Sequence, residues 1–120
     1  MELQFFERHV KGIHVFDLDG KIMGAGESAS LCDRLKQLVA SGEKNIILNF
    51  KKVRWINSPG IGMMLSCLTS LRRAGGDVHF VSVEGKVAFY FRITKLDTVL
   101  KVYKDEEKAL EAILSPKTPS

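Results

Sequence analysis

The chain reads NIILNFKKVRWINSPGIG from Asn45 to Gly62. Its first part, Asn45–Phe50, is mostly apolar, which is typical of a central strand that is covered on both faces. A helix is predicted to follow, because Asn57 or Ser58 is a good N-cap and proline is favoured at the first helical position. The helix is expected to continue to about Arg73, where a pair of glycines ends it. A buried strand that leads into a helix predicts an α/β fold.

Strands and helices are predicted to alternate along the rest of the chain. Strands are expected at Leu3–Phe6, Gly12–Leu18, Asn45–Phe50, Val78–Val83 and Val99–Tyr103, and helices at Ser28–Leu38, Ser58–Arg73, Gly85–Arg92 and Asp105–Leu114. Alternation of this kind favours parallel pairing, whereas the first two strands, joined around His9–Lys11, are expected to form an antiparallel hairpin. We therefore predict a mixed, mostly parallel five-stranded sheet with about four helices.

Length and composition indicate one domain, which we place at residues 1–114, followed by a frayed tail over 115–120. The net charge of +4 comes from basic and acidic residues that are scattered along the chain, which argues against a nucleic-acid-binding surface. No apolar run is long enough to span a membrane, and no signal peptide is recognisable. Cys32 and Cys67 form no CxxC motif, so both are expected to be reduced, as small apolar residues of a cytoplasmic protein.

Two glycines distinguish the start of the second helix from a simple cap. Gly60 and Gly62 each cost about 1 kcal/mol relative to alanine inside a helix, so they are expected where something approaches the backbone closely. The helix is also apolar on more than one face, because Met63 and Cys67 extend its core stripe. Extra burial within the domain and contact with a partner both explain this surface.

From Asn49 to Gly62 the sequence resembles the signature of the STAS domain of bacterial anti-sigma factor antagonists. That signature is a hydrophobic strand, a short connection and then Asp-Ser-Ser-Gly-hydrophobic-Gly. Four further segments agree with the family in order and spacing: Val15–Ile22, Gly75–Val78, Ile93–Tyr103 and Glu106–Leu110. The resemblance thus extends over nearly the whole chain and implies the STAS fold.

The resemblance also implies a mechanism of partner switching. In that family a kinase that is also an anti-sigma factor phosphorylates the first serine of the motif, and Ser58 occupies the matching position. The unphosphorylated protein binds the kinase and releases its client, phosphorylation breaks this complex, and a serine phosphatase restores it. A phosphate at a helix N-terminus can be tolerated by the fold, while its added charge of about −1.5 to −2 disrupts a docked interface.

On this view the chain is a binding module and not an enzyme, and acts as a monomer or weak dimer without a cofactor. ATP would belong to the kinase, because the chain has no GxxxxGK[ST] loop. The partner surface is expected to combine the loop after the second strand with the start of the second helix, at one end of the sheet. Its residues are Gly24, Ala25, Gly26, Glu27, Ser28, Asn57, Pro59, Gly60, Ile61, Gly62, Met63 and Cys67.

Two departures from the family motif keep an alternative open. Asn57 stands where the family has aspartate, which removes a negative charge, and Pro59 replaces the second serine, which removes an N–H that a phosphate could use. The alternative is a phosphorylation-independent STAS scaffold or adaptor in a larger assembly, in which Ser58 serves only as a helix cap.

A remote alternative is a magnesium-dependent phosphatase. The sequence FDLDGK resembles the DxDG motif of haloacid dehalogenase-type phosphatases, with Asp17 as nucleophile and Asp19 as acid/base. Ser82 and Lys86 would complete such a site. Against this reading, Lys21 stands where that family has threonine or valine, and the chain is short for that fold.

The remaining residues of interest have ordinary structural explanations. His9, His14 and His79 show no ligand spacing among themselves, so no metal site is predicted and the three are expected on the surface or in packing. Trp55 follows a buried strand and is expected to lie in the core.

Overall fold

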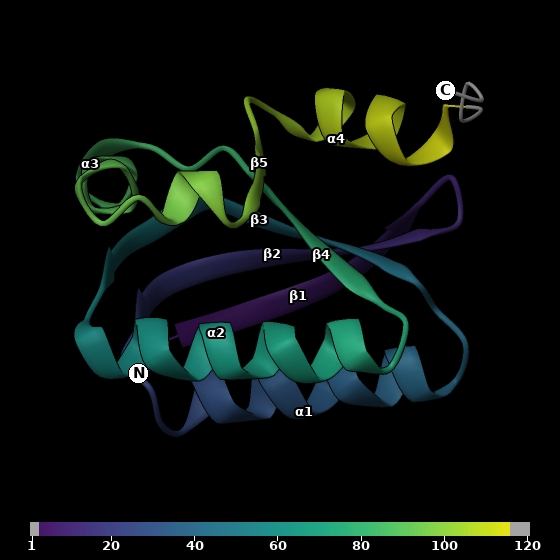
Figure 1. Ribbon diagram of the computed structural model, residues 1–120, viewed down its shortest axis with the longest axis horizontal. Helices are drawn as coiled ribbons and strands as arrows, with labels where there is room; N and C mark the ends of the chain where they lie inside the picture. Colours follow the sequence, from purple (N-terminus) through teal and green to yellow (C-terminus); the bar gives the residue numbers. More distant parts are fainter. Residues whose placement is uncertain (1–2, 116–120) are drawn as a thin grey trace.

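The computed structural model describes residues 3–115, which form a five-stranded sheet with helices on both faces (Figure 1). The strands are β1 (Leu3–Val10), β2 (Ile13–Ile22), β3 (Asn45–Ile56), β4 (Asp77–Val81) and β5 (Lys101–Tyr103). The helices are α1 (Glu27–Ala40), α2 (Ser58–Arg73), α3 (Gly85–Ile93) and α4 (Glu106–Leu114), with a 3-10 turn, η1, at Leu96–Thr98. Of the predicted tail, residues 116–120 lie outside the described residues.

The sheet has the strand order β1-β2-β3-β4-β5, in which β1 is antiparallel to β2 and all other neighbours are parallel. The predicted mixed sheet and its N-terminal hairpin are therefore confirmed. The hairpin turns at Lys11 and Gly12, whose φ angles of 52° and 82° suit a tight two-residue turn. Three strands are longer than predicted: β1 runs on to Val10 and β2 to Ile22, and β3 runs on to Ile56 because it stays paired with β2 as far as Ile22.

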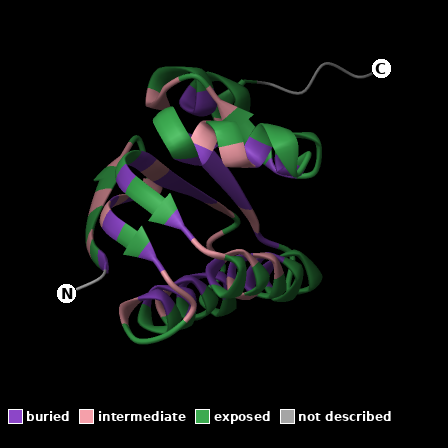
Figure 2. Cartoon of the chain, turned by 90° about the vertical axis from the view of Figure 1, so that its left-hand side faces the viewer, coloured by how far each residue is buried: buried purple, intermediate pink, exposed green. Residues whose placement is uncertain are grey.

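The helices divide the core into two parts. On one face of the sheet, α1 and α2 lie side by side over the main cluster of apolar side chains, and α4 covers the other face over a smaller cluster (Figure 1). Buried residues follow the strands and the inner sides of the helices, and exposed residues lie outside (Figure 2). α3 packs beside β3 and β4 through Phe91, whose ring centroid is 5.9 Å from that of Phe50 and 6.3 Å from that of Phe80.

Polar contacts fasten α4 to the sheet. The Asp105 side chain caps the helix by accepting the Lys108 N–H at 2.9 Å, as its position in the sequence predicted. Arg8 of β1 donates to Asp17 of β2, with its Nε 2.6 Å from the carboxylate, and also binds Glu106 in the first turn of α4. One arginine thus joins two strands to the last helix.

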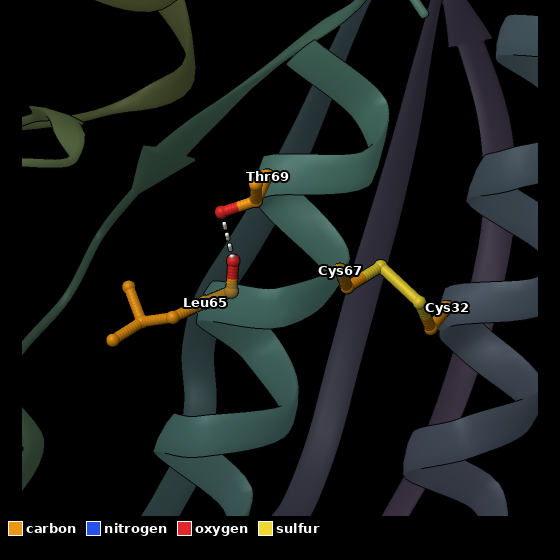
Figure 3. Close-up of a disulfide and its surroundings, with 4 residues drawn as sticks. All are labelled: Cys32, Leu65, Cys67 and Thr69. Carbon is orange, nitrogen blue, oxygen red and sulfur yellow. Dashed lines mark hydrogen bonds between the residues drawn. A yellow bond between two sulfur atoms is a disulfide. The ribbon is translucent and has the colours of Figure 1, made fainter. Parts of the chain in front are cut away.

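A disulfide joins Cys32 of α1 to Cys67 of α2, so the prediction of reduced cysteines is wrong (Figure 3). Both residues are buried where the two helices pack together, and their Cα atoms are 6.0 Å apart, within the usual range for a disulfide. Next to this crosslink, the Thr69 hydroxyl donates to the Leu65 carbonyl at 3.0 Å. The prediction failed because the cysteines are 35 positions apart in sequence, and only the packing of α1 on α2 brings them together.

His79 of β4 is buried, with its side-chain nitrogens held on both sides. Its Nδ1 lies 3.1 Å from the Tyr103 hydroxyl and its Nε2 lies 2.9 Å from Oδ1 of Asn45. Burial lowers the pKa of His79 to about 4. The imidazole is therefore neutral at pH 7 and serves in packing, as the sequence predicted.

This burial predicts a loss of stability in weak acid. Between about pH 6.5 and the lowered pKa, the unfolded state binds a proton on His79 that the folded state does not bind, so stability falls as the pH falls. From about pH 7.5 to about pH 5 the loss is expected to be about 2 kcal/mol. Urea unfolding at both pH values measures it. The His79→Gln variant, which cannot take up a proton there, should lose most of this pH dependence, and an equal dependence in both proteins would contradict the assignment.

Candidate functional site

The first turn of α2 begins directly where β3 ends. Asn57 is the N-cap of the helix, and its Oδ1 accepts the Gly60 N–H at 2.7 Å. Ser58 is the first helical residue and is exposed. Since Pro59 has no N–H and that of Gly60 is already bonded, this turn offers little beyond the Ser58 amide and the helix dipole to an anion. A charged group on the Ser58 hydroxyl would depend on side chains for compensation.

Gly60 is the glycine whose backbone is closely approached. A Cβ placed on Gly60 would lie 2.2 Å from the carbonyl oxygen of Ile22 at the end of β2. The same oxygen accepts the Asn57 N–H at 3.2 Å. A Cβ on Gly62, in contrast, would meet no described atom within 4 Å. The predicted close approach is therefore confirmed for Gly60, where the neighbour is the chain itself, while Gly62 lies exposed.

The loop between β2 and α1 packs against the start of α2. Gly24 has a φ of +91°, and a Cβ at this position would lie 2.8 Å from the carbonyl carbon of Pro59. The chain therefore needs glycine here, both for its conformation and for space. The prediction that this loop lies at the same end of the sheet as Ser58 is confirmed.

The residues predicted to contact a partner differ in their exposure. Ser28, Gly60 and Cys67 are buried and lie beneath this surface, and Cys67 is held in the disulfide. The other nine are exposed or half-buried: Gly24, Ala25, Gly26, Glu27, Asn57, Pro59, Ile61, Gly62 and Met63.

Trp55 lies on the surface beside Ser58, so the prediction that it belongs to the core is wrong. Its side chain is 40% exposed, and its ring stacks on that of Tyr90 of α3, with centroids 6.1 Å apart and planes 8° apart. Trp55 is on the part of β3 that extends beyond its pairing with β4, which ends at Asn49 and Val81. Because β4 ends at Val81, the edge of β3 beyond Asn49 has no neighbouring strand on that side and faces α3 and solvent.

The β3 extension and α3 enclose an apolar hollow next to Ser58. The Ser58 Oγ lies 3.4 Å from the hydroxyl oxygen of Tyr90. Two further side chains of α3, Phe89 and Ile93, are 54% and 59% exposed. We call this feature the Ser58 hollow; it is lined by Trp55, Asn57, Ser58, Lys86, Phe89, Tyr90 and Ile93. Its lining is mostly apolar with one cation, which suits the docking of another protein's apolar side chains.

Sequence reasoning missed the contribution of α3 to this surface. The sequence did contain a signal for a second apolar surface on α3. Apolar residues occupy positions 87, 88, 89, 90, 91 and 93 and so lie on all sides of the helix, whereas a helix that buries only one face needs fewer of them. Only Val87 and Phe91 are buried. Of the others, Phe89, Tyr90 and Ile93 line the Ser58 hollow.

The structure gives Asp17 a structural role. Its carboxylate accepts hydrogen bonds from Arg8 at 2.6 and 3.0 Å and from Asn49 at 2.9 Å, and the Arg8 guanidinium holds the pKa of Asp17 below its usual value. Asp19 lies 3.5 Å from Arg54. Lys86, a residue of the remote phosphatase alternative, lines the Ser58 hollow instead. Asp17 therefore belongs to the contacts that hold β1, β2 and α4 together, and Asp19 contacts β3.

The described residues that could hold a metal ion lie away from Ser58. Glu7, His9 and His14 come together at the β1–β2 hairpin, next to the first residues of β3. Ser58 lies two residues after Ile56, the last residue of β3, so the length of that strand separates the two places (Figure 1).

Comparison with known proteins agrees with this architecture. The STAS domain family matches residues 7–109. A protein from Thermotoga neapolitana, classed by name with the anti-sigma factor antagonists, is 30% identical over 77 residues, which are 64% of this chain and 68% of the relative. None of the helices within residues 3–115 has the length and hydrophobicity needed to cross a bilayer.

Solved structures share the fold over almost their whole length. A protein of the antagonist class from Thermotoga maritima superposes with a TM-score of 0.77 at 23% identity, covering 91% of this chain and 93% of that one. The anti-sigma factor antagonist SpoIIAA, in its unphosphorylated form, gives a TM-score of 0.75 at 18% identity, covering 96% and 100%. SpoIIAA from Bacillus is also known in a phosphorylated form, which gives a TM-score of 0.67 at 18% identity over 92% and 99% of the two chains. With the family match over most of its length, this chain belongs to the STAS domain family.

Proposed function

We propose that this chain is an anti-sigma factor antagonist that works in the cytoplasm as a non-catalytic binding switch, set by reversible phosphorylation of Ser58. The partners we propose are an anti-sigma factor that is also a serine kinase and a serine phosphatase that reverses the modification. The observation that carries the proposal is the exposed Ser58 hydroxyl at the rim of an apolar hollow on the first turn of α2. The names of the relatives support the antagonist class, and the two forms of SpoIIAA support phosphorylation as the control.

The surroundings of Ser58 explain how one phosphate would act as a switch. The group would add a charge of about −1.5 to −2 beside the exposed side chains of Phe89 and Ile93. The first turn of α2 compensates little of it, because Pro59 has no N–H and Asn57 occupies that of Gly60. Lys86 is the cation of the hollow. The phosphate would thus stay on the docking surface and repel an apolar or acidic partner, while the fold remains unchanged.

Labelling with radioactive ATP tests this function directly. We expect a lysate of the source organism to phosphorylate the purified chain, and we expect Ser58→Ala to abolish the label. Ser66→Ala is the matched control, because Ser66 is another exposed serine of α2 and lies outside the hollow. Equal labelling of wild type and Ser58→Ala would contradict the proposal.

Binding of the labelling kinase provides a second prediction. The Ser58→Asp variant places a carboxylate at the rim of the hollow, so its affinity for the kinase isolated by the labelling assay is expected to fall at least about tenfold, or about 1.4 kcal/mol. Ser58→Ala should bind about as well as wild type, since it only removes a hydroxyl. Calorimetric titration of each variant measures this difference, and equal affinities for Ser58→Asp and Ser58→Ala would count against a charge switch.

The helix cap favours one alternative function, a STAS scaffold or adaptor that is never phosphorylated. Asn57 and Pro59 make a complete helix start in which the Ser58 hydroxyl has no role of its own beyond its approach to Tyr90. A scaffold could use the same apolar hollow for permanent contact. Because both functions would use the same hollow, Phe89→Ser and Ser58→Asp should weaken partner binding under either one. Only the switch predicts that the labelling assay places phosphate on Ser58.

A further inference from the structure

We propose that the β1–β2 hairpin carries a binding site for a divalent transition-metal ion, best suited to Zn²⁺, with Glu7, His9 and His14 as its protein ligands. One ligand atom from each of these side chains lies within 4.8 Å of the others. Two imidazoles and one carboxylate form a ligand set that zinc uses when it keeps a fourth position open for water. This site is independent of the function proposed for Ser58.

The fold creates the cluster through the pairing of the hairpin strands. His9 of β1 lies directly opposite His14 of β2, and their ring centroids are 4.2 Å apart. Glu7 is two residues before His9, so its side chain points to the same face of the strand. Arg8, between them, points to the other face and binds Asp17 and Glu106. The positions of Glu7, His9 and His14 in the sequence therefore gave no sign of a metal site, because only the two-residue turn of the hairpin brings them together.

The distances in the cluster are close to those that a zinc ion requires. With bonds of about 2.1 Å and tetrahedral angles, neighbouring ligand atoms lie about 3.4 Å apart. Oε2 of Glu7 is 2.8 Å from Nδ1 of His14 and 3.6 Å from Nε2 of His9. The His9 side chain is 62% exposed, so its ring can rotate to close the remaining gap to His14.

Two neighbouring side chains orient the ligands. Nε2 of His14 lies 3.1 Å from a carboxylate oxygen of Glu43, which directs the other ring nitrogen, Nδ1, towards Glu7. A carboxylate behind a ligating histidine is the usual arrangement in zinc sites and strengthens them. Arg34 of α1 holds both oxygens of the Glu7 carboxylate, with Nε 2.9 Å from Oε1 and Nη2 3.0 Å from Oε2, so the ligating oxygen is shared with a guanidinium N–H. The site is thus supported from α1 and from the segment that follows it.

Calorimetric titration of the chelator-treated full chain with zinc chloride tests the proposal. We expect one ion per chain with a Kd on the order of 10 µM or tighter. Because His9 is exposed and its loss leaves the fold intact, His9→Ala is expected to weaken binding at least about tenfold. Lys11→Ala in the same hairpin turn is the matched control and should bind zinc like wild type.

A second readout tests the geometry and the role of Glu43. Co²⁺ bound in place of zinc should show the visible absorption of a four-coordinate ion, and Glu43→Gln should weaken Co²⁺ binding about tenfold while His9 and His14 still ligate. Circular dichroism checks that each variant is folded. The proposal is overturned if wild type takes up no zinc, or if His9→Ala binds zinc with the wild-type Kd.

Discussion

Replacement of Gly60 by alanine is expected to lower the free energy of unfolding by about 2–4 kcal/mol, a large part of the stability of a small domain. The added Cβ would lie 2.2 Å from the Ile22 carbonyl oxygen and 3.1 Å from Oδ1 of Asn57. Both contacts involve the start of α2, and the first is with backbone, which cannot move aside as a flexible side chain can. Relief of the clash would separate α2 from β2 and break the Asn57 cap, which alone is worth about 1 kcal/mol.

Gly62→Ala is the matched control, because it makes the same substitution two residues later in the same helix. A Cβ there meets no described atom within 4 Å, so the variant should be more stable than wild type by about 0.5–1 kcal/mol, through the higher helix propensity of alanine. Urea unfolding followed by circular dichroism gives both values. Similar changes in the two variants would contradict the close approach at Gly60.

Reduction of the disulfide is the change with the second large expected effect. The crosslink closes a loop between residues 35 positions apart, and the chain-entropy relation for a loop of this length gives about 4 kcal/mol. Urea unfolding of wild type should therefore shift to lower urea concentration when a reducing agent is added. The Cys32→Ala/Cys67→Ala double variant should unfold identically with and without that agent.

The state of these cysteines also bears on the proposed location. The cytoplasm of most cells keeps thiols reduced, so a chain working there should switch between a crosslinked and a less stable form according to the redox conditions. Alkylation of free thiols before and after reduction, followed by mass measurement, counts the cysteines engaged in the bond. Two free thiols in the purified, unreduced chain, or stability that does not respond to the reducing agent, would contradict the crosslink.

The fold was predictable where the structure of a segment depends on residues close to it in the sequence. The hairpin, the parallel strands and the bounds of α2 at Ser58–Arg73 follow from turn residues, apolar runs and capping, which act over a few neighbours. The extension of β3 was not predictable in the same way. Lys51, Lys52 and Arg54 interrupt its apolar pattern, because this part of the strand pairs with β2 but extends past β4 and stays largely exposed.

The candidate site was predictable only in part, for a related reason. The family pattern located Ser58 and the loop from Gly24, which lie on segments joined by a strand end and a helix start. The exposed aromatic side chains of α3 enter the site through tertiary packing, as Trp55 does once β3 extends beyond the sheet. Tertiary contacts also join the two cysteines, which lie on separate helices whose packing no short-range pattern encodes.

Intact mass with site mapping of the chain purified from its native cells tests most directly whether Ser58 is phosphorylated in the cell. The switch predicts a fraction of molecules heavier by one phosphate, about 80 Da, which maps to Ser58 and is absent from Ser58→Ala expressed in the same cells. If the chain carries no phosphate across growth and stress conditions while it remains bound to its partner, the switch is contradicted, and Ser58 is a helix residue of a permanent scaffold.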